Sequence, residues 1–278
     1  MIELKPFKDL SEVEDIELHD LDFKRAESEN VALKANYPRF EKRGDVGILL
    51  VHGFTSSPLE MQPLEEYLTG QGFSTYNVRL AGHASDYRYL NMITYADWYD
   101  SVKYGLFILR RNCKKVFIAG SSMGGLVSLM TAHLNGLDGA VLLAPCIKIK
   151  SPMTFLTPII SKFMPVMPKI GFDMQYSDIF YDNWPMKGVA ELYRLTVYTA
   201  GFTSDFKMPL LGFQFPGDMI VSAKATKNFF GRAGSEDKLY VEFPDKDGQT
   251  HILTSHLNQH RDEMFANIAV WLKDRSEK

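Results

Sequence analysis

Short apolar runs alternate along the chain with longer segments in which apolar residues recur at helical spacing. A short continuous apolar run is typical of a buried strand, and the wider spacing is typical of a helix packed on a core. The runs predict strands at 46–52, 73–79, 115–120, 139–144, 209–215 and 238–243. The longer segments predict helices at 58–70, 94–112, 123–135, 222–232 and 257–274. This alternation predicts an α/β fold with a mostly parallel central sheet and helices on both faces.

Two segments depart from this alternation. Residues 1–45 are charged and weakly periodic, so we expect an N-terminal arm or a short antiparallel edge strand there and assign it no role. Residues 151–205 contain no convincing strand but several prolines and methionines. We expect this insertion to form a small cap, or lid, on a core made of residues 46–150 and 206–278.

Ser122 lies between a predicted strand and a predicted helix, with Gly120 two positions before it and Gly124 two positions after it. Glycines in this pattern indicate a tight turn in which a side chain would collide with the neighbouring strand or helix. Such a turn directs the serine hydroxyl outward, so the pattern predicts a nucleophile. Chance alone yields about 0.1 such matches in a chain of this length, so partners elsewhere in the sequence decide the interpretation.

Two partners follow in the chain. Asp218 comes after the run 209–215 and a Pro-Gly turn, which places a carboxylate just beyond the carboxyl end of a strand. His251 comes after the strand 238–243 and a polar loop. The order Ser122, Asp218, His251 is the order of the catalytic triad in the α/β-hydrolase fold. The sequence therefore predicts a nucleophile, an orienting acid and a general base.

Other residues compete for two of these roles. Asp245 and Asp247, in the loop beside His251, are the alternative positions for the acid. His256 and His260 are the alternative bases, and their spacing also resembles a metal-binding pair. A leucine follows His256 where a zinc protease has glutamate, and no third ligand is evident, so we predict no metal site.

Acyl transfer also requires two backbone N–H groups directed at the oxyanion that develops on the substrate. One belongs to the residue after the nucleophile, which is Met123, and the other to the loop after the strand 46–52. Its place in that loop assigns the second donor to Phe54. His52, at the start of the loop, is expected to be structural rather than catalytic.

Composition narrows the class of protein. A net charge of −3 and an isoelectric point near 6.2 carry no electrostatic footprint of a nucleic-acid-binding protein. Cys113 and Cys146 are too few for a disulfide framework and favour a reducing compartment. The N-terminus lacks the apolar region of a secretory signal, so we expect a cytoplasmic protein.

The cap is expected to bind the acyl part of a substrate. Its stretch 151–170 holds four prolines and two lysines, which excludes a membrane-spanning helix of about 20 residues. Methionine side chains adapt well to flexible apolar ligands. The apolar side chains expected to line the acyl site are Phe155, Ile159, Phe163, Met164 and Met167. The cap could also make transient contact with a lipid surface.

Four stretches together resemble the bacterial monoacylglycerol lipase and carboxylesterase branch of the α/β hydrolases. They are residues 47–55, 79–83, 97–98 and 120–125. The resemblance implies a triad of Ser122, Asp218 and His251, with oxyanion donors at Phe54 and Met123. It also implies hydrolysis of carboxylic esters without a metal or organic cofactor.

Three departures from the family pattern accompany the resemblance. Ala84 replaces a small glycine that many relatives have after the Gly-His pair, and the lead into Asp218 through Pro216 is unusual. Neither change touches the chemistry. The cap matches the family only loosely, which leaves selectivity for glycerides open.

The expected reaction is hydrolysis of acyl esters through an acyl-enzyme on Ser122, with monoacylglycerol-like or other medium-to-long-chain lipid esters as the small-molecule substrates. A thioesterase, an amidase or a carbon–carbon bond hydrolase would use the same three residues. A ligand-binding protein without catalysis is the alternative from another class. The sequence makes no prediction of oligomeric state.

Overall fold

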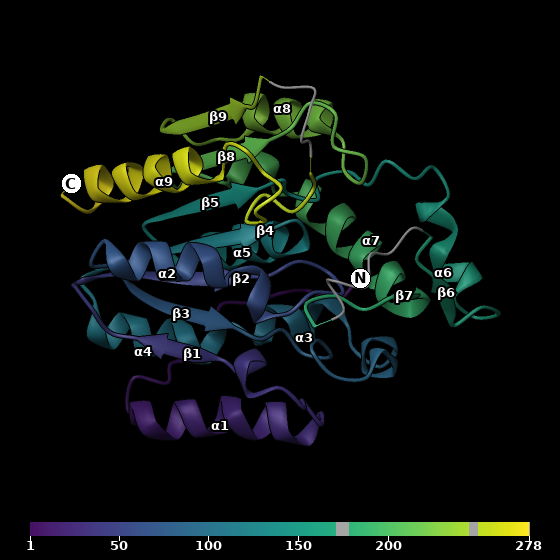
Figure 1. Cartoon of the computed structure of the whole chain (residues 1–278), viewed down its shortest axis with the longest axis horizontal. Helices are drawn as coiled ribbons and strands as arrows, with labels where there is room; N and C mark the ends of the chain where they lie inside the picture. Colours follow the sequence, from purple (N-terminus) through teal and green to yellow (C-terminus); the bar gives the residue numbers. More distant parts are fainter. Residues whose placement is uncertain (171–177, 245–249, 278) are drawn as a thin grey trace.

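A seven-stranded sheet forms the centre of the molecule in a computed structural model that describes residues 1–170, 178–244 and 250–277 (Figure 1). Its strands, in spatial order, are β1 (Arg39–Glu41), β3 (Ser74–Val78), β2 (Val46–Val51), β4 (Lys115–Ser121), β5 (Gly139–Leu143), β8 (Leu210–Gln214) and β9 (Lys238–Glu242). Neighbouring strands from β3 to β9 pair in parallel, and β1 pairs antiparallel with β3 at one edge. The predicted mostly parallel sheet is therefore confirmed.

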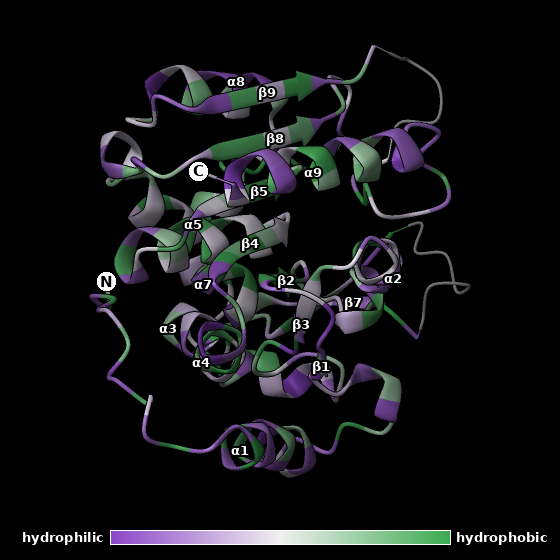
Figure 2. Cartoon of the chain, turned by 90° about the vertical axis from the view of Figure 1, so that its left-hand side faces the viewer, coloured by the Kyte–Doolittle hydropathy of each residue, from purple (hydrophilic) through white to green (hydrophobic). Residues whose placement is uncertain are grey.

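Helices cover both faces of the sheet (Figures 1 and 2). One face carries α2 (Gln62–Gly70) and α9 (Arg261–Ser276), and the other carries α3 (Tyr95–Asp100), α4 (Lys103–Asn112) and α5 (Met123–Asn135). A further helix, α8 (Ala223–Arg232), connects β8 to β9. The central strands are buried accordingly, and every residue from 48 to 51 in β2 is inaccessible to solvent.

The sequence placed the six parallel strands to within one or two residues but placed three helices less well. The predicted helix 58–70 begins with a 3-10 turn, Pro58–Glu60, and the α-helix starts only at Gln62. The predicted helix 94–112 is two helices separated by a turn at Ser101 and Val102. At this turn the Ser101 hydroxyl accepts from the Ala81 N–H, in the loop after β3, at 2.9 Å and donates to the Asp97 carbonyl at 2.7 Å. The last helix begins at Arg261 rather than 257, because the Asn258 side chain stabilises turns. It donates to the Leu253 carbonyl at 2.8 Å and accepts from the His260 N–H at 3.0 Å.

The N-terminal segment contains an unpredicted helix, α1 (Asp15–Ser28), before the edge strand β1. Its apolar stripe is weak, since its buried residues are Leu18, Asp22 and Ala26. Polar contacts help to hold the helix instead. Arg25 pairs with Asp100 at 2.9 Å, and the Tyr76 hydroxyl donates to Asp22 at 2.8 Å. Because these contacts are tertiary, hydrophobic spacing could not reveal the helix.

The cap segment is more regular than its sequence suggests. Within 151–205 the structure has α6 (Thr157–Ile160), β6 (Val166–Pro168), β7 (Asn183–Pro185) and α7 (Met186–Ala200). The expectation of no strand here was wrong, because β6 and β7 pair antiparallel in a small separate sheet. Each strand has only three residues and contains a proline, so neither shows a strand pattern in sequence. Met174 of the cap lies outside the described residues.

None of the helices in the described ranges combines the length and the apolar character needed to cross a membrane.

Asp22 is a carboxyl group buried between α1 and the sheet, with 1% of its surface exposed. Burial raises the pKa of Asp22 to about 6, although the bond from Tyr76 and nearby arginines partly oppose this. A carboxyl whose pKa is higher in the folded state than in the unfolded chain adds stability only at low pH. That stability is lost as the pH rises from about 4 to about 6.

We therefore predict that Asp22→Asn, which keeps the shape but not the charge, changes stability in a pH-dependent way. Relative to wild type, the free energy of unfolding of the variant should rise by about 2 kcal/mol more at pH 7.5 than at pH 4.5. Urea denaturation at the two pH values measures this difference. Asp20→Asn, on the exposed side of α1, is the control. An equal effect of Asp22→Asn at both pH values would contradict the prediction.

Candidate active site

Ser122 occupies a one-residue turn between the end of β4 and the start of α5. Its backbone has φ 53° and ψ −113°, a combination that is strained for any residue with a side chain. The neighbouring glycines make the turn possible. A Cβ on Gly120 would lie 2.2 Å from the Gly124 carbonyl oxygen, and a Cβ on Gly124 would lie 2.3 Å from the Val51 carbonyl oxygen. The predicted tight corner is therefore present, for the steric reason that the sequence suggested.

Backbone hydrogen bonds hold this corner against the adjacent strand. The Ser122 N–H donates to the Leu143 carbonyl at 2.8 Å, and the Ser122 carbonyl accepts from the Cys146 N–H at 3.0 Å. Both partners lie at the carboxyl end of β5 or just after it. Hydrogen bonds thus hold the peptide groups on both sides of Ser122.

The three residues of the predicted triad lie within hydrogen-bonding distance. The His251 Nε2 atom is 2.8 Å from the Ser122 hydroxyl, and the His251 Nδ1 atom is 2.7 Å from a carboxylate oxygen of Asp218. They follow β4, β8 and β9, three strands whose carboxyl ends meet at one edge of the sheet. An ionised carboxylate only accepts hydrogen bonds, so Nδ1 carries the proton and Nε2 is left to accept one from Ser122.

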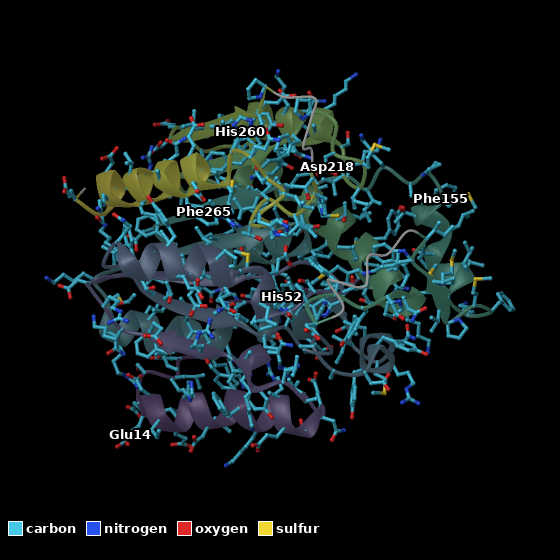
Figure 3. The ribbon with its side chains drawn as sticks, in the orientation of Figure 1. Glu14, His52, Phe155, Asp218, His260 and Phe265 are labelled. Carbon is cyan, nitrogen blue, oxygen red and sulfur yellow. The ribbon has the colours of Figure 1, made fainter. Side chains whose placement is uncertain are left out.

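Asp218 lies just beyond the carboxyl end of β8 and is labelled at the upper right of Figure 3. Only 2% of its surface is exposed. Burial alone raises the pKa of this carboxyl, but hydrogen bonding and attraction to His251 outweigh it. The N–H groups of Ile220 and Val221 also donate to Asp218, at 2.8 and 3.0 Å. The net effect is a pKa below the usual value, so Asp218 is ionised near neutral pH.

The residues that competed with His251 for the role of base do not lie in the hydrogen-bonded triad. His260 stacks face to face on Phe243, with ring centroids 5.1 Å apart, and His256 is exposed. Asp245 and Asp247 lie outside the described residues. Within the part of the chain that the structure describes, no three His, Cys, Asp or Glu side chains form a group that could hold a metal ion.

The loop after β2 lies directly beside the serine, since a Cβ on Gly53 would be 3.4 Å from the Ser122 Cβ. His52 stabilises this loop: its Nδ1 lies 2.9 Å from the Gly53 carbonyl, and its Nε2 accepts from the Leu80 N–H at 3.2 Å. Burial lowers the pKa of His52 to about 3, so the ring stays neutral. This environment agrees with the structural role expected of His52.

The two expected oxyanion donors flank the serine from different elements. Phe54 is the third residue of the loop beside Ser122, and Met123 is the first residue of α5. The N–H of a first helical residue has no acceptor within its own helix, so the Met123 N–H is available at the helix N-terminus. A negative charge at that terminus is favoured by the helix dipole.

The cap side chains expected to bind an acyl group are largely exposed. Their exposed fractions range from 39% for Met167 to 83% for Phe163, and the others are Phe155, Ile159 and Met164. Figure 3 shows Phe155 at the outer end of the cap, well away from Asp218. The structure therefore leaves these apolar side chains exposed and does not bring Phe155 to the triad.

Different cap residues contact the site, and the sequence did not indicate them. The Lys169 ammonium group donates to the Thr55 hydroxyl at 2.7 Å, and the Trp184 ring stacks on Phe54. Burial lowers the pKa of Lys169 to about 8, although Asp182 partly opposes this. No spacing rule links residues so far apart in the chain, so sequence patterns contained no signal for these contacts.

Comparison with known proteins gives consistent results. The family described as serine aminopeptidase S33 matches residues 44–180. A thermostable monoacylglycerol lipase from Bacillus sp. strain H-257 is 30% identical over 208 residues, which are 73% of this chain and 83% of that lipase. A carboxylesterase from Bacillus subtilis strain 168 is 22% identical over 240 residues, covering 84% of this chain and 94% of the esterase.

Two solved structures share the fold. A structure reported for the metagenome-derived lipolytic enzymes LipS and LipT superimposes with a TM-score of 0.79 at 20% identity, covering 87% of this chain and 99% of that one. A monoacylglycerol lipase from Paleococcus ferrophilus gives 0.71 at 19% identity, covering 86% and 98%. These structures show the fold, and the 30% identity to the Bacillus lipase over 73% of this chain shows the family: the chain belongs to the monoacylglycerol lipase and carboxylesterase branch of the α/β-hydrolase superfamily.

Proposed function

We propose that this protein hydrolyses carboxylic esters of medium-to-long acyl chains through an acyl-enzyme on Ser122. The observation that carries the proposal is the hydrogen-bonded series from the Ser122 hydroxyl through His251 to Asp218, at 2.8 and 2.7 Å. The family supports hydrolysis of acyl esters, and its named relatives are a monoacylglycerol lipase and a carboxylesterase. We expect a cytoplasmic location from the sequence alone.

In the proposed mechanism His251 is the general base. The Ser122 oxygen forms a bond to the ester carbonyl carbon while its proton moves to the His251 Nε2 atom. The resulting imidazolium is stabilised by the ionised Asp218. The backbone N–H groups of Phe54 and Met123 donate to the oxyanion of the tetrahedral intermediate.

Two further steps complete the cycle. The carbon–oxygen bond to the alcohol breaks, and the alcohol leaves with the proton held by His251. Water then attacks the acyl-enzyme while His251 takes its proton, and the same proton is returned to Ser122 as the acid departs. These residues suffice for the reaction without a metal or organic cofactor.

The apolar cap supports a lipid-like acyl group as the substrate. We propose that exposed apolar side chains of the cap bind an acyl chain: Phe155, Ile159, Phe163, Met164 and Met167. A lipid surface is a second partner that such a surface would favour. Burial of each methylene is worth about 0.8 kcal/mol, so several methylenes would raise affinity substantially.

Removal of the nucleophile is the first test of the function. Ser122→Ala should lower kcat by about 10⁴-fold or more, because the alanine cannot form the acyl-enzyme. The measurement is steady-state hydrolysis of an aryl acetate and of a monoacylglycerol. Ser121→Ala, at the preceding residue, should retain turnover. Near-normal kcat in Ser122→Ala would refute the assignment.

The acid and base are tested by variants in which an uncharged amide side chain replaces the ionisable one. Asp218→Asn should lower kcat by roughly 10⁴-fold while the protein still folds, because the amide favours the wrong histidine tautomer. His251→Gln should be similarly impaired, and His256→Gln should be active. An active Asp218→Asn variant together with an inactive Asp245→Asn or Asp247→Asn variant would move the acid to the loop beside His251.

The acyl-binding surface is tested with aryl esters from acetyl to dodecanoyl. In wild type, kcat/KM should rise with chain length until the surface is filled. Phe163→Ser should reduce kcat/KM for long chains more than for acetyl, because only long chains reach that position. Ile16→Ser, an equally apolar exposed site on α1, is the control. A kcat/KM that does not change with acyl length would contradict a lipid ester substrate and favour a small polar ester. Assays of matched thioesters and amides would distinguish an esterase from a thioesterase or an amidase.

A further inference from the structure

Thr55, in the loop beside the nucleophile, has an unfavourable backbone conformation. Its φ is 59°, in the left-handed region that β-branched residues rarely adopt. Such a conformation costs free energy and persists only where the surroundings determine it. Thr55 is also buried, with 2% of its surface exposed. The contacts that hold Thr55 therefore reveal what shapes the loop.

The cap donates hydrogen bonds to the carbonyl and to the hydroxyl of Thr55. The Tyr181 N–H donates to the Thr55 carbonyl at 2.9 Å, and the Lys169 ammonium donates to its hydroxyl at 2.7 Å. Tyr181 is in turn anchored to the core, since its hydroxyl donates to the Gly82 carbonyl at 3.0 Å. The strained residue is thus fixed by hydrogen bonds from a segment more than 100 residues away in sequence.

The cap also fixes the side chain of the preceding residue, Phe54. The Trp184 ring stacks on the Phe54 ring with an interplanar angle of 9° and centroids 6.3 Å apart. The Lys169 ammonium lies 4.5 Å from the centroid of the same Trp184 ring. The lysine that binds Thr55 therefore also contacts the tryptophan that stacks on Phe54. On α7, a Cβ at Gly188 would come within 3.0 Å of the Phe54 ring, which shows how closely the cap approaches.

The core holds the other end of the same short loop. The Gly53 N–H donates to a carboxylate oxygen of Glu60 at 2.8 Å, and the Gly53 carbonyl lies 2.9 Å from His52 Nδ1. Gly53 is therefore fixed by the core, and Thr55 is fixed by the cap. The Phe54 N–H shares a planar peptide unit with the Gly53 carbonyl, which the core holds, and the next residue along the chain is Thr55, which the cap holds.

We propose that Lys169, with Trp184, is a positioning residue for the oxyanion donor at Phe54. This inference rests on the proposed function, in which the Phe54 N–H stabilises the tetrahedral intermediate. Its consequence differs from that of an acyl-binding cap. Loss of the Lys169 contact impairs the chemical step for every ester, whatever its acyl length, because all of them form the same oxyanion.

The test compares two cap lysines in the full chain. Lys169→Met keeps the apolar stem but removes the donor, and should lower kcat by about 10- to 100-fold on both acetyl and dodecanoyl aryl esters with little change in KM. Lys162→Met, at an exposed position of the cap, should be unchanged. A trifluoromethyl ketone forms an adduct whose oxyanion occupies the same oxyanion site. In Lys169→Met its inhibition constant should rise by the same factor by which kcat falls.

A double-mutant cycle separates this role from general damage to the cap. Thr55→Val keeps the β-branched shape and removes the hydroxyl that accepts from Lys169, so it should lower kcat as Lys169→Met does. The double variant should be no worse than Lys169→Met alone, because that variant already lacks the hydrogen bond that Thr55→Val removes. If Lys169→Met fails to fold, Thr55→Val alone carries the kinetic test.

Three results would overturn the proposal: normal kcat in Lys169→Met, a loss confined to dodecanoyl esters, or additive effects in the double variant. Its failure is distinguishable from failure of the proposed function. An inactive Ser122→Ala variant with a normal Lys169→Met variant refutes only the positioning role. Turnover in Ser122→Ala refutes the proposed function itself.

Discussion

The close approach of β4, α5 and β2 around Ser122 is the constraint on which the site depends. The turn has one residue, and its backbone is tolerable only because two glycines leave room for carbonyl oxygens that a Cβ would strike at little more than 2 Å. Folding of the parallel sheet provides the free energy that keeps this turn in place. The same sheet brings the carboxyl ends of β8 and β9 alongside, and with them Asp218 and His251.

Strain is distributed over the loops at this edge of the sheet. Ser122, Thr55 and Ala144 all have positive φ values, and each follows one of the central strands. Backbone strain of this kind is tolerated where surrounding hydrogen bonds leave no alternative. Around Ser122 those bonds come from the core, and around Thr55 they come from the cap. The cap therefore belongs to the architecture of the site as well as to its surface.

Sequence patterns predicted the parts of the structure that depend on local constraints. The apolar runs located the six parallel strands, and the glycine spacing located Ser122 because Gly120 and Gly124 approach each other within one short turn. The order of Asp218 and His251 sufficed to pair them, because parallel strands present their carboxyl ends together. The helix α1 was missed because Asp22 interrupts its apolar stripe, and the Lys169 contact was missed because it depends on how the cap folds back on Thr55.

Every step of the proposed reaction depends on Ser122 being an activated nucleophile. Labelling with a fluorophosphonate at neutral pH, followed by peptide mapping with mass spectrometry, tests this directly. We expect one covalent adduct per chain, on the Ser122 hydroxyl, with the adjacent Ser121 unmodified. An adduct on another residue, or no adduct in folded protein, would contradict it.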